Sequence, residues 1–383
     1  MTRRPVAAAA VTVVVVAAGV GGLLRWMGRA PFGPAAAGAP GAGASAQTTQ
    51  GQAASTTAPA ATGGARLLWT LAGHTASPVS LAVSRDGTRA LSGGSHGDGA
   101  VRVWDIVKGQ PVTRFTGHGD KSDVLAVAFT PDGAAAVSAA GPEDDALRVW
   151  DLGTGAERTQ LSGDIGLLFR AISEDTTLAL AQEMTAEGRS KGFSLWRLDQ
   201  GRRVVGVDAP DHASALAISP DGQTLLSGGG DGTLTLWKAS GEKIRSFVAH
   251  GPGTTVREVA FASGGRLLVT SADGPGATGN APARAVMLWD PETGVAFRTI
   301  RNATHFALAD DGRTLAVAGD ATSIRVLDVI TARELARLDG HEGGVTALAF
   351  APGGTRLVSA GADRTVRVWA IAAREPVPND RSQ

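Results

Sequence analysis

Seven copies of one short apolar pattern constrain the fold of this chain more than any other feature. Each copy alternates apolar with other residues and ends near a Trp or a Leu. The copies read VRVWD at 101–105, LRVWD at 147–151, FSLWR at 193–197, LTLWK at 234–238, VMLWD at 286–290, IRVLD at 324–328 and VRVWA at 366–370. Intervals of about 40–50 residues indicate a repeat architecture. Because one such unit cannot bury both faces of its own sheet, the pattern predicts units packed side by side.

The last unit shows what one repeat contains. Residues 345–350 and 366–369 alternate small or apolar side chains with others, and residues 356–359 form another short run between them. Turn residues such as Gly, Pro and Asp separate the three runs. Period-two alternation bounded by such residues predicts β-strands.

Two further motifs recur in register with these strands. Four units open with a two-residue motif that ends in His. The motif is Gly-His at 73–74, 117–118 and 340–341 and Ala-His at 249–250. A Pro-Asp-Gly turn follows the first strand at 131–133 and 220–222. Together these motifs resemble the WD-repeat (tryptophan–aspartate repeat) β-propeller family over residues 66–370. The resemblance implies an all-β, seven-bladed β-propeller of four-stranded antiparallel blades. It also implies a scaffold that binds proteins or peptides on the face with the Gly-His loops.

The resemblance further implies a buried polar network inside each complete repeat. A buried Trp offers a donor alone, so it needs an acceptor, which a Ser hydroxyl joined to His and Asp would supply. Three repeats carry all four residues: His74–Ser92–Asp98–Trp104, His118–Ser138–Asp144–Trp150 and His341–Ser359–Asp363–Trp369. The repeat ending at Trp237 keeps Ser227 and Asp231 but has no aligned His. The repeats ending at Trp196 and Leu327 lack the network residues, and the Asp of the Trp289 repeat stays unassigned.

One strand-like run lies outside the seven units. Residues 67–71 precede the first Gly-His pair, much as another short run precedes the last one. In WD-repeat propellers each sequence repeat is offset from its blade. The run at 67–71 is therefore expected to pair with residues 366–369 and close the ring, which removes exposed sheet edges.

Catalytic and metal-binding chemistry finds little support in the sequence. Without cysteine, disulfides, thiol nucleophiles and Cys-based zinc sites are excluded. Four of the seven His open repeats, and His96 and His212 fall in predicted loops. His305 lies in a predicted innermost strand with no second ligand near it in sequence. We therefore expect that the protein is not an enzyme and binds no cofactor. We also expect it to have no catalytic, cofactor-binding or metal-binding residue. The alternative is a propeller enzyme, or a small-ligand-binding propeller, that uses the central channel.

Two properties bear on the partner. The 36 basic and 36 acidic residues leave no net charge, which argues against nucleic-acid binding. Predicted turns on the Gly-His face are lengthened, at 93–99, 139–145, 182–192 and 272–285. Loops on a rigid scaffold often carry recognition, so we expect a protein or peptide partner there. Tolerated surface insertion is the other interpretation.

The N-terminal region indicates a membrane protein. After a short basic segment, 1–5, residues 6–24 carry no charge and would span about 28 Å as a helix. Basic residues and Trp26 follow. We interpret 6–24 as a transmembrane signal anchor in contact with the lipid bilayer. A cleaved secretory signal, with Ala44-Ser45-Ala46 as a late cleavage site, and a buried segment of a soluble domain are the alternatives.

The rest of the chain completes the domain scheme. Residues 25–65 are rich in Ala, Gly, Pro, Ser and Thr, a composition typical of a flexible linker. The propeller is expected at 66–370 and a tail at 371–383. The Ala- and Gly-rich composition suggests a bacterial source. A slight excess of positive charge before the anchor favours a single-pass cell-membrane protein with an extracytoplasmic propeller. Secretion after signal cleavage is the alternative.

Overall fold

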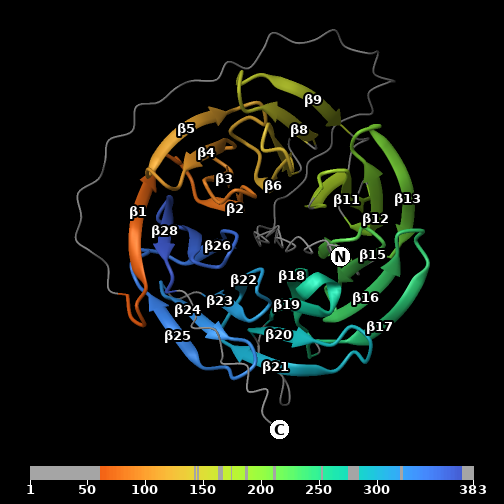
Figure 1. Cartoon of the computed structure of the whole chain (residues 1–383). Helices are drawn as coiled ribbons and strands as arrows, with labels where there is room; N and C mark the ends of the chain where they lie inside the picture. The colour runs from red at the N-terminus through yellow and green to blue at the C-terminus, as the bar shows by residue number, and fades with distance from the viewer. Residues whose placement is uncertain are drawn as a thin grey trace, which may run out of the picture.

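Seven four-stranded antiparallel sheets form a closed ring in the computed structural model (Figure 1). The structure describes residues 61–372, except 142–143, 145, 163–166, 174, 186–188, 210–212, 252, 275–283 and 320–321. The predicted seven-bladed propeller is thereby confirmed. The predicted anchor at 6–24 and nearly all of the linker and tail lie outside the described residues. Within the described part of the chain, no helix is long and apolar enough to cross a bilayer.

Each blade runs from an innermost to an outermost strand. Blade 1 contains β2 (Pro78–Val83), β3 (Arg89–Gly94), β4 (Val101–Asp105) and β5 (Gln110–Phe115). Blade 2 contains β6 (Val124–Phe129), β7 (Ala135–Ala140), β8 (Ala146–Asp151) and β9 (Glu157–Ser162). Blade 3 contains β10 (Leu167–Ile172), β11 (Leu178–Met184), β12 (Ser190–Arg197) and β13 (Arg202–Asp208). Blade 4 contains β14 (Ala215–Ile218), β15 (Thr224–Gly228), β16 (Thr233–Lys238) and β17 (Lys243–Val248).

The remaining blades follow the same order. Blade 5 contains β18 (Thr255–Ala262), a 3₁₀ turn (Ser263–Gly265), β19 (Leu267–Asp273), β20 (Ala285–Trp289) and β21 (Ala296–Arg301). Blade 6 contains β22 (His305–Leu308), β23 (Thr314–Ala318), β24 (Ile324–Asp328) and β25 (Glu334–Leu338). Blade 7 contains β26 (Val345–Phe350), β27 (Arg356–Gly361), β28 (Thr365–Ala370) and β1 (Arg66–Ala72).

The two ends of the described chain meet in blade 7. Strand β1 pairs antiparallel with β28, with Leu67 opposite Trp369 and Leu71 opposite Val366. The predicted ring closure is therefore confirmed. The residues just before β1, which were predicted to belong to the linker, also contact the propeller. Thr62 donates its backbone N–H to Arg337 O on β25 at 3.0 Å, so the chain also touches blade 6.

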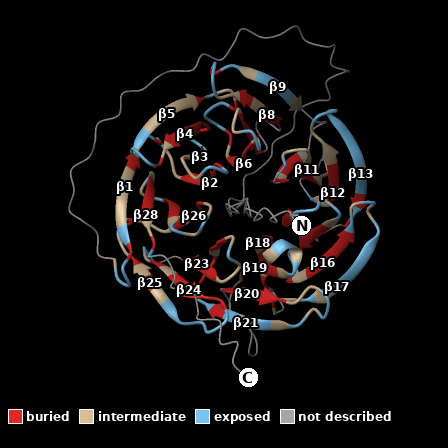
Figure 2. Ribbon diagram, in the orientation of Figure 1, coloured by how far each residue is buried: buried red, intermediate tan, exposed pale blue. Residues whose placement is uncertain are grey.

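The hydrophobic core lies between neighbouring blades. Inner and middle strands are mostly buried, whereas the outer strands carry most of the exposed residues (Figure 2). Trp104, Trp150 and Trp369 are among the largest fully buried side chains. Burying a large apolar side chain stabilises the fold by about 1.5–3 kcal/mol, so these repeat residues contribute strongly to blade packing.

One expectation about strand limits is corrected by the structure. The predicted turn at 182–192 is shorter, because β11 continues to Met184 and β12 begins at Ser190. Their backbone pairing persists into the predicted loop, with Glu183 opposite Gly192.

Candidate functional site

In blade 1, the four predicted network residues come from four different parts of the fold. His74 lies between β1 and β2, Ser92 on β3, Asp98 in the following turn and Trp104 on β4. The Ser92 hydroxyl bonds His74 Nε2 at 2.6 Å and accepts the Trp104 indole N–H at 2.7 Å. His74 Nδ1 bonds the Asp98 carboxylate. The hydroxyl therefore satisfies both ring systems.

Blades 2 and 7 repeat this geometry. The distances in blade 2 are 2.5 Å for His118–Asp144, 2.7 Å for His118–Ser138 and 2.8 Å for Trp150–Ser138. Those in blade 7 are 2.9 Å for His341–Asp363, 2.8 Å for His341–Ser359 and 2.8 Å for Trp369–Ser359. The structure thus brings together all four residues in each of the three complete repeats.

In blades 1 and 2, the pKa of the network His and that of its Asp partner are both lowered, which favours a neutral imidazole beside a carboxylate. Burial lowers the pKa of His74, and the hydrogen bond and charge of Asp98 only partly oppose this effect. Burial acts against ionisation of Asp98, but the hydrogen bonds from His74 and Thr75 and the nearby charge of Arg102 together outweigh that effect, so the carboxyl pKa is lowered. In the tautomer that fits, Nδ1–H donates to the carboxylate and Nε2 accepts the Ser hydroxyl proton.

Sequence analysis missed the arginines that neutralise these carboxylates. Arg148 lies four residues after Asp144 and contacts it at 2.9 Å, and it also bonds Glu157 at 2.9 Å. Arg102 and Arg367 occupy the same place in blades 1 and 7, at 3.7 and 3.5 Å from Asp98 and Asp363. The shared letters RVW in the three complete repeats were the available signal.

The incomplete repeats form smaller networks. In blade 4, Trp237 donates to Ser227 at 2.9 Å, while Asp231 accepts the backbone N–H of Thr233 at 3.0 Å. In blade 3, Trp196 donates to Ser194 of its own strand at 2.9 Å. In blade 6, Leu327 replaces the Trp and packs in the apolar cluster between blades. These blades therefore rely more on apolar packing.

Blade 5 has a network that the sequence analysis did not identify. Thr270 takes the place of Ser, bonding His250 Nε2 at 2.9 Å and accepting the Trp289 N–H at 2.9 Å. Burial lowers the pKa of His250 to about 4. A hydroxyl-bearing residue at the aligned position was the signal that would have revealed this network.

The network serines are closed to substrates. A Ser-His-Asp set is the arrangement of many hydrolases, in which the Ser oxygen must reach a substrate carbonyl. Here Ser92, Ser138 and Ser359 are 0% exposed, and each accepts a Trp N–H. The arrangement therefore supports a structural role. Among the residues that the structure describes, no group of three or more His, Asp or Glu is placed to hold a metal ion.

We define the top face of the propeller as the face with the Gly-His loops. One lengthened turn on this face is held in place by hydrogen bonds. The turn between β3 and β4 is hydrogen-bonded to the loop that leads into blade 2. His96 N donates to Asp123 Oδ1 at 2.7 Å, and Gly97 N donates to Asp120 O at 2.6 Å. His96 Nδ1 also lies 2.8 Å from Lys121 O. Blades 1 and 2 thus present a joined, preformed surface.

Comparison with known families agrees with this geometry. The profile described as "WD domain, G-beta repeat" matches residues 65–105, 109–151, 207–238, 241–274 and 332–370. The chain is a member of the WD40-repeat β-propeller family. The matched stretches of this WD40 propeller include all three complete networks. Strands β10–β12 of blade 3 and β22–β24 of blade 6 lie outside them, and neither of these blades has a His-containing network.

Several curated WD-repeat proteins are similar over part of the chain. A periodic tryptophan protein 2 homolog of Dictyostelium discoideum is 32% identical over 166 residues, covering 41% of this chain and 17% of that protein. Human pre-mRNA-processing factor 17 is 29% identical over 165 residues, covering 41% and 27%. Arabidopsis thaliana autophagy-related protein 16 is 26% identical over 187 residues, covering 48% and 35%. The chain therefore matches about a third or less of the length of these relatives.

Proposed function

We propose that this protein is a non-catalytic scaffold that binds a protein or peptide partner through the top face of its propeller. WD40 propellers commonly act in this way, and the relatives share repeats while their names point to different processes. The observation that carries the proposal is the His96–Asp123 contact, which fixes a lengthened turn on the top face. A preformed loop binds at a lower entropic cost than a loop that must be ordered.

The membrane anchor forms the second half of the proposal. Residues 6–24 are uncharged and flanked by basic residues, and the following Ala- and Gly-rich segment is suited to a tether. We propose that this segment holds the propeller at a cell membrane, with the propeller on the extracytoplasmic side. The partner would then be met close to the bilayer surface.

Crosslinking in intact membranes tests the proposed binding face. A photocrosslinker in place of Lys121, on the top face, should trap a partner that mass spectrometry identifies. The same group in place of Lys108, in the turn after β4 on the opposite face, should not trap it. Asp123→Ala should weaken capture from a second top-face position, because it removes the acceptor for His96 N–H. Equal capture from both faces would contradict the proposal.

A further inference from the structure

The cross-strand register defines one equivalent position on the innermost strands. At this position Ser80 lies opposite Gly93, Ala126 opposite Ala139, Ala215 opposite Gly228 and Ala347 opposite Ala360. Blade 3 has Phe169 opposite Ala181 there, and blades 5 and 6 carry ionisable residues, with Glu258 opposite Ser271 and His305 opposite Ala318. Since small residues suffice in four blades, the blade architecture itself does not require a Glu or a His there.

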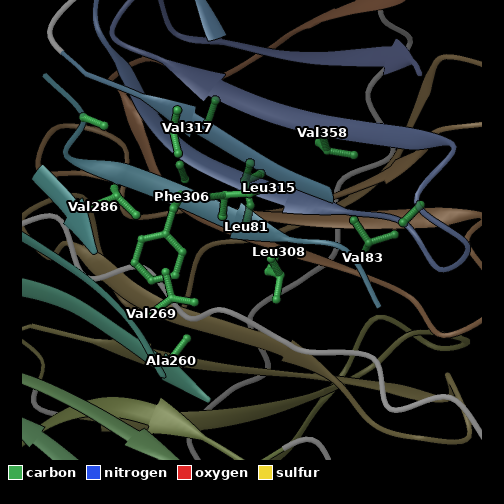
Figure 3. Close-up of a cluster of buried hydrophobic side chains, with 14 of the residues drawn as sticks. Leu81, Val83, Ala260, Val269, Val286, Phe306, Leu308, Leu315, Val317 and Val358 are labelled. Atoms are coloured by element: carbon green, nitrogen blue, oxygen red, sulfur yellow. The ribbon is translucent and has the colours of Figure 1, made fainter. Parts of the chain in front are cut away.

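The inner strands of blades 5 and 6 are also spaced differently. For every other pair of neighbouring blades, the innermost strands come within 8 Å at many Cα positions, whereas β18 and β22 scarcely do. The side chains of Glu258 and His305 reach across this wider seam. Beside them, Phe306 of β22 packs with Val269 and Val286 of blade 5 in an apolar cluster (Figure 3).

Glu258 and His305 form a direct pair across the seam. A Glu258 carboxylate oxygen, Oε1, bonds His305 Nδ1, and the backbone N–H of Phe306 also points to the carboxylate. The side chain of Glu258 is 1% exposed, whereas that of His305 is 17% exposed. His305 therefore gives a deeply buried acid a route for proton exchange with solvent.

Two oxygen atoms at this pair lack partners. Glu258 Oε2 and Ser271 Oγ are both buried and make no hydrogen bond. Because their residues are directly opposite on neighbouring strands, their side chains project from the same face of the sheet at a Cβ separation of about 5 Å. A buried polar atom without a partner costs about 1–3 kcal/mol, and an ordered water usually removes that cost.

The surroundings isolate the pair from other charges. On β18, Arg257 is engaged with Asp273 at 2.6 Å. Of the other strands packed against β18 and β22, β19 carries only this Asp273, and β14, β15, β23 and β26 contain no ionisable residue. Burial raises the pKa of the Glu258 carboxyl, against the opposing effects of His305. The proton balance of this seam therefore rests on Glu258 and His305 themselves.

We propose that Glu258, His305 and Ser271 form a proton-responsive, water-bridged latch between blades 5 and 6. When the pair holds one titratable proton, it has no net charge. The seam is then closed by the hydrogen bond between Glu258 and His305 and by a water that bridges Glu258 Oε2 and Ser271 Oγ. Loss of that proton to solvent through His305 leaves a bare buried carboxylate. This charge weakens the seam and lets blades 5 and 6 separate more readily.

Other seams have latches that do not titrate in this way. Ser80 Oγ donates to Val124 O at 2.7 Å between blades 1 and 2, and Ser214 Oγ donates to Val256 O at 3.0 Å between blades 4 and 5. Each joins a hydroxyl to a backbone carbonyl of the next innermost strand. Ser80→Ala is therefore a matched control, because it removes an inter-blade bond without changing any titratable group.

Melting of the full chain between pH 5 and 8 tests the proposal. The folded carboxyl keeps its proton where the unfolded one has lost it, so the Glu258 contribution to stability falls as pH rises above the usual Glu range. Relative to wild type, Glu258→Gln should gain about 2 °C or more in Tm over this interval. Ser80→Ala should shift Tm by the same amount at every pH. A pH-independent offset for Glu258→Gln would overturn the proposal.

Hydrogen exchange locates the effect and covers a variant that folds poorly. In wild type, after correction for intrinsic rates, peptides from β18 and β22 should exchange faster at pH 8 than at pH 5, whereas peptides from β2 and β6 should not. His305→Gln removes the charge and hydrogen bond that oppose the raised pKa of Glu258, so the folded carboxyl keeps its proton to higher pH and the difference should become steeper. Equal pH dependence at both seams, or no change in His305→Gln, would also overturn the proposal.

Discussion

At the scale of single residues, the polar networks explain why three blades have Trp fully buried at the same place. An indole N–H in an apolar interior needs an acceptor, and the Ser hydroxyl supplies it while His and Asp fix its orientation. The Asp is therefore a distant but necessary member of each network. Its removal should be felt at the buried His rather than at the surface.

Asp363→Ala tests this dependence. The change leaves His341 Nδ1 and the backbone N–H of Glu342 without their acceptor, so we expect a loss of about 1–3 kcal/mol in unfolding free energy. Denaturant titration measures the loss. Glu342→Ala, at the neighbouring exposed side chain, is the control and should be near neutral. Comparable losses for both variants would argue against the network.

His250 predicts a pH effect in blade 5. Its folded pKa of about 4 lies below the unfolded value of 6.5, so the unfolded chain takes up a proton first as pH falls. Its contribution is complete above pH 6.5 and declines towards pH 4, by at most about 3 kcal/mol. His250→Gln should lose less stability than wild type between pH 7 and 4.5 in denaturant titrations. An unchanged loss would show that His250 is not buried as a neutral ring.

Sequence reasoning succeeded for residues that recur at fixed offsets and failed for those that do not. His74, Ser92, Asp98 and Trp104 could be read from spacing, because the same four types return in other repeats. Glu258 and His305 could not, because their pairing depends on the distance between two blades, which no strand periodicity reveals. Thr270 could have been predicted from the sequence, since it differs from the aligned Ser by one methyl group.

At the scale of strands, the closure of the ring depends on one short segment. β1 contributes the outer strand of blade 7 although it comes first in the propeller. The pattern RLLWTLA before the first Gly-His pair was sufficient to predict this role. The contact of Ala61 and Thr62 with β25 was not predictable, because two residues carry no recognisable period.

Truncation tests the closure. Removing residues 1–60 should leave the melting temperature of the propeller unchanged, whereas removing 1–72 exposes an edge of β28 and should lower it or cause aggregation. Removing 1–64 should give an intermediate value, since it deletes the Thr62–Arg337 contact and keeps β1. Equal melting temperatures for the shortest and longest truncations would contradict the role of β1.

At the scale of the whole molecule, the proposal makes the segment before the propeller a tether to the anchor. A flexible chain of about 35 residues would have a root-mean-square span of about 30–35 Å, which would let the propeller reach partners near a bilayer. Such reach would raise the effective concentration of the propeller for a membrane-bound partner. A tether of this kind would thus add to the affinity of the top face itself.

Fractionation with protease shaving tests the proposed location. A tagged full chain expressed in bacteria should remain in the membrane pellet, and its propeller should be digested when spheroplasts are treated from outside. Deletion of residues 6–24 should move the protein to the soluble fraction. Full protection in intact spheroplasts would reverse the topology, and a soluble form beginning near Gln47 would establish signal cleavage instead.

Blade 7 combines the first strand of the propeller with its last three strands, and this sets an order of events during synthesis. β1 leaves the ribosome near the start of the propeller, yet its partner β28 is made about 300 residues later, or about 15–60 s at typical elongation rates. Blades 1 to 6 each consist of consecutive strands and can form while the chain is still growing. The first strand therefore stays without its partner during that interval, and ring closure is the last step. A chain that ends before β28 cannot close the ring, whereas a finished chain can.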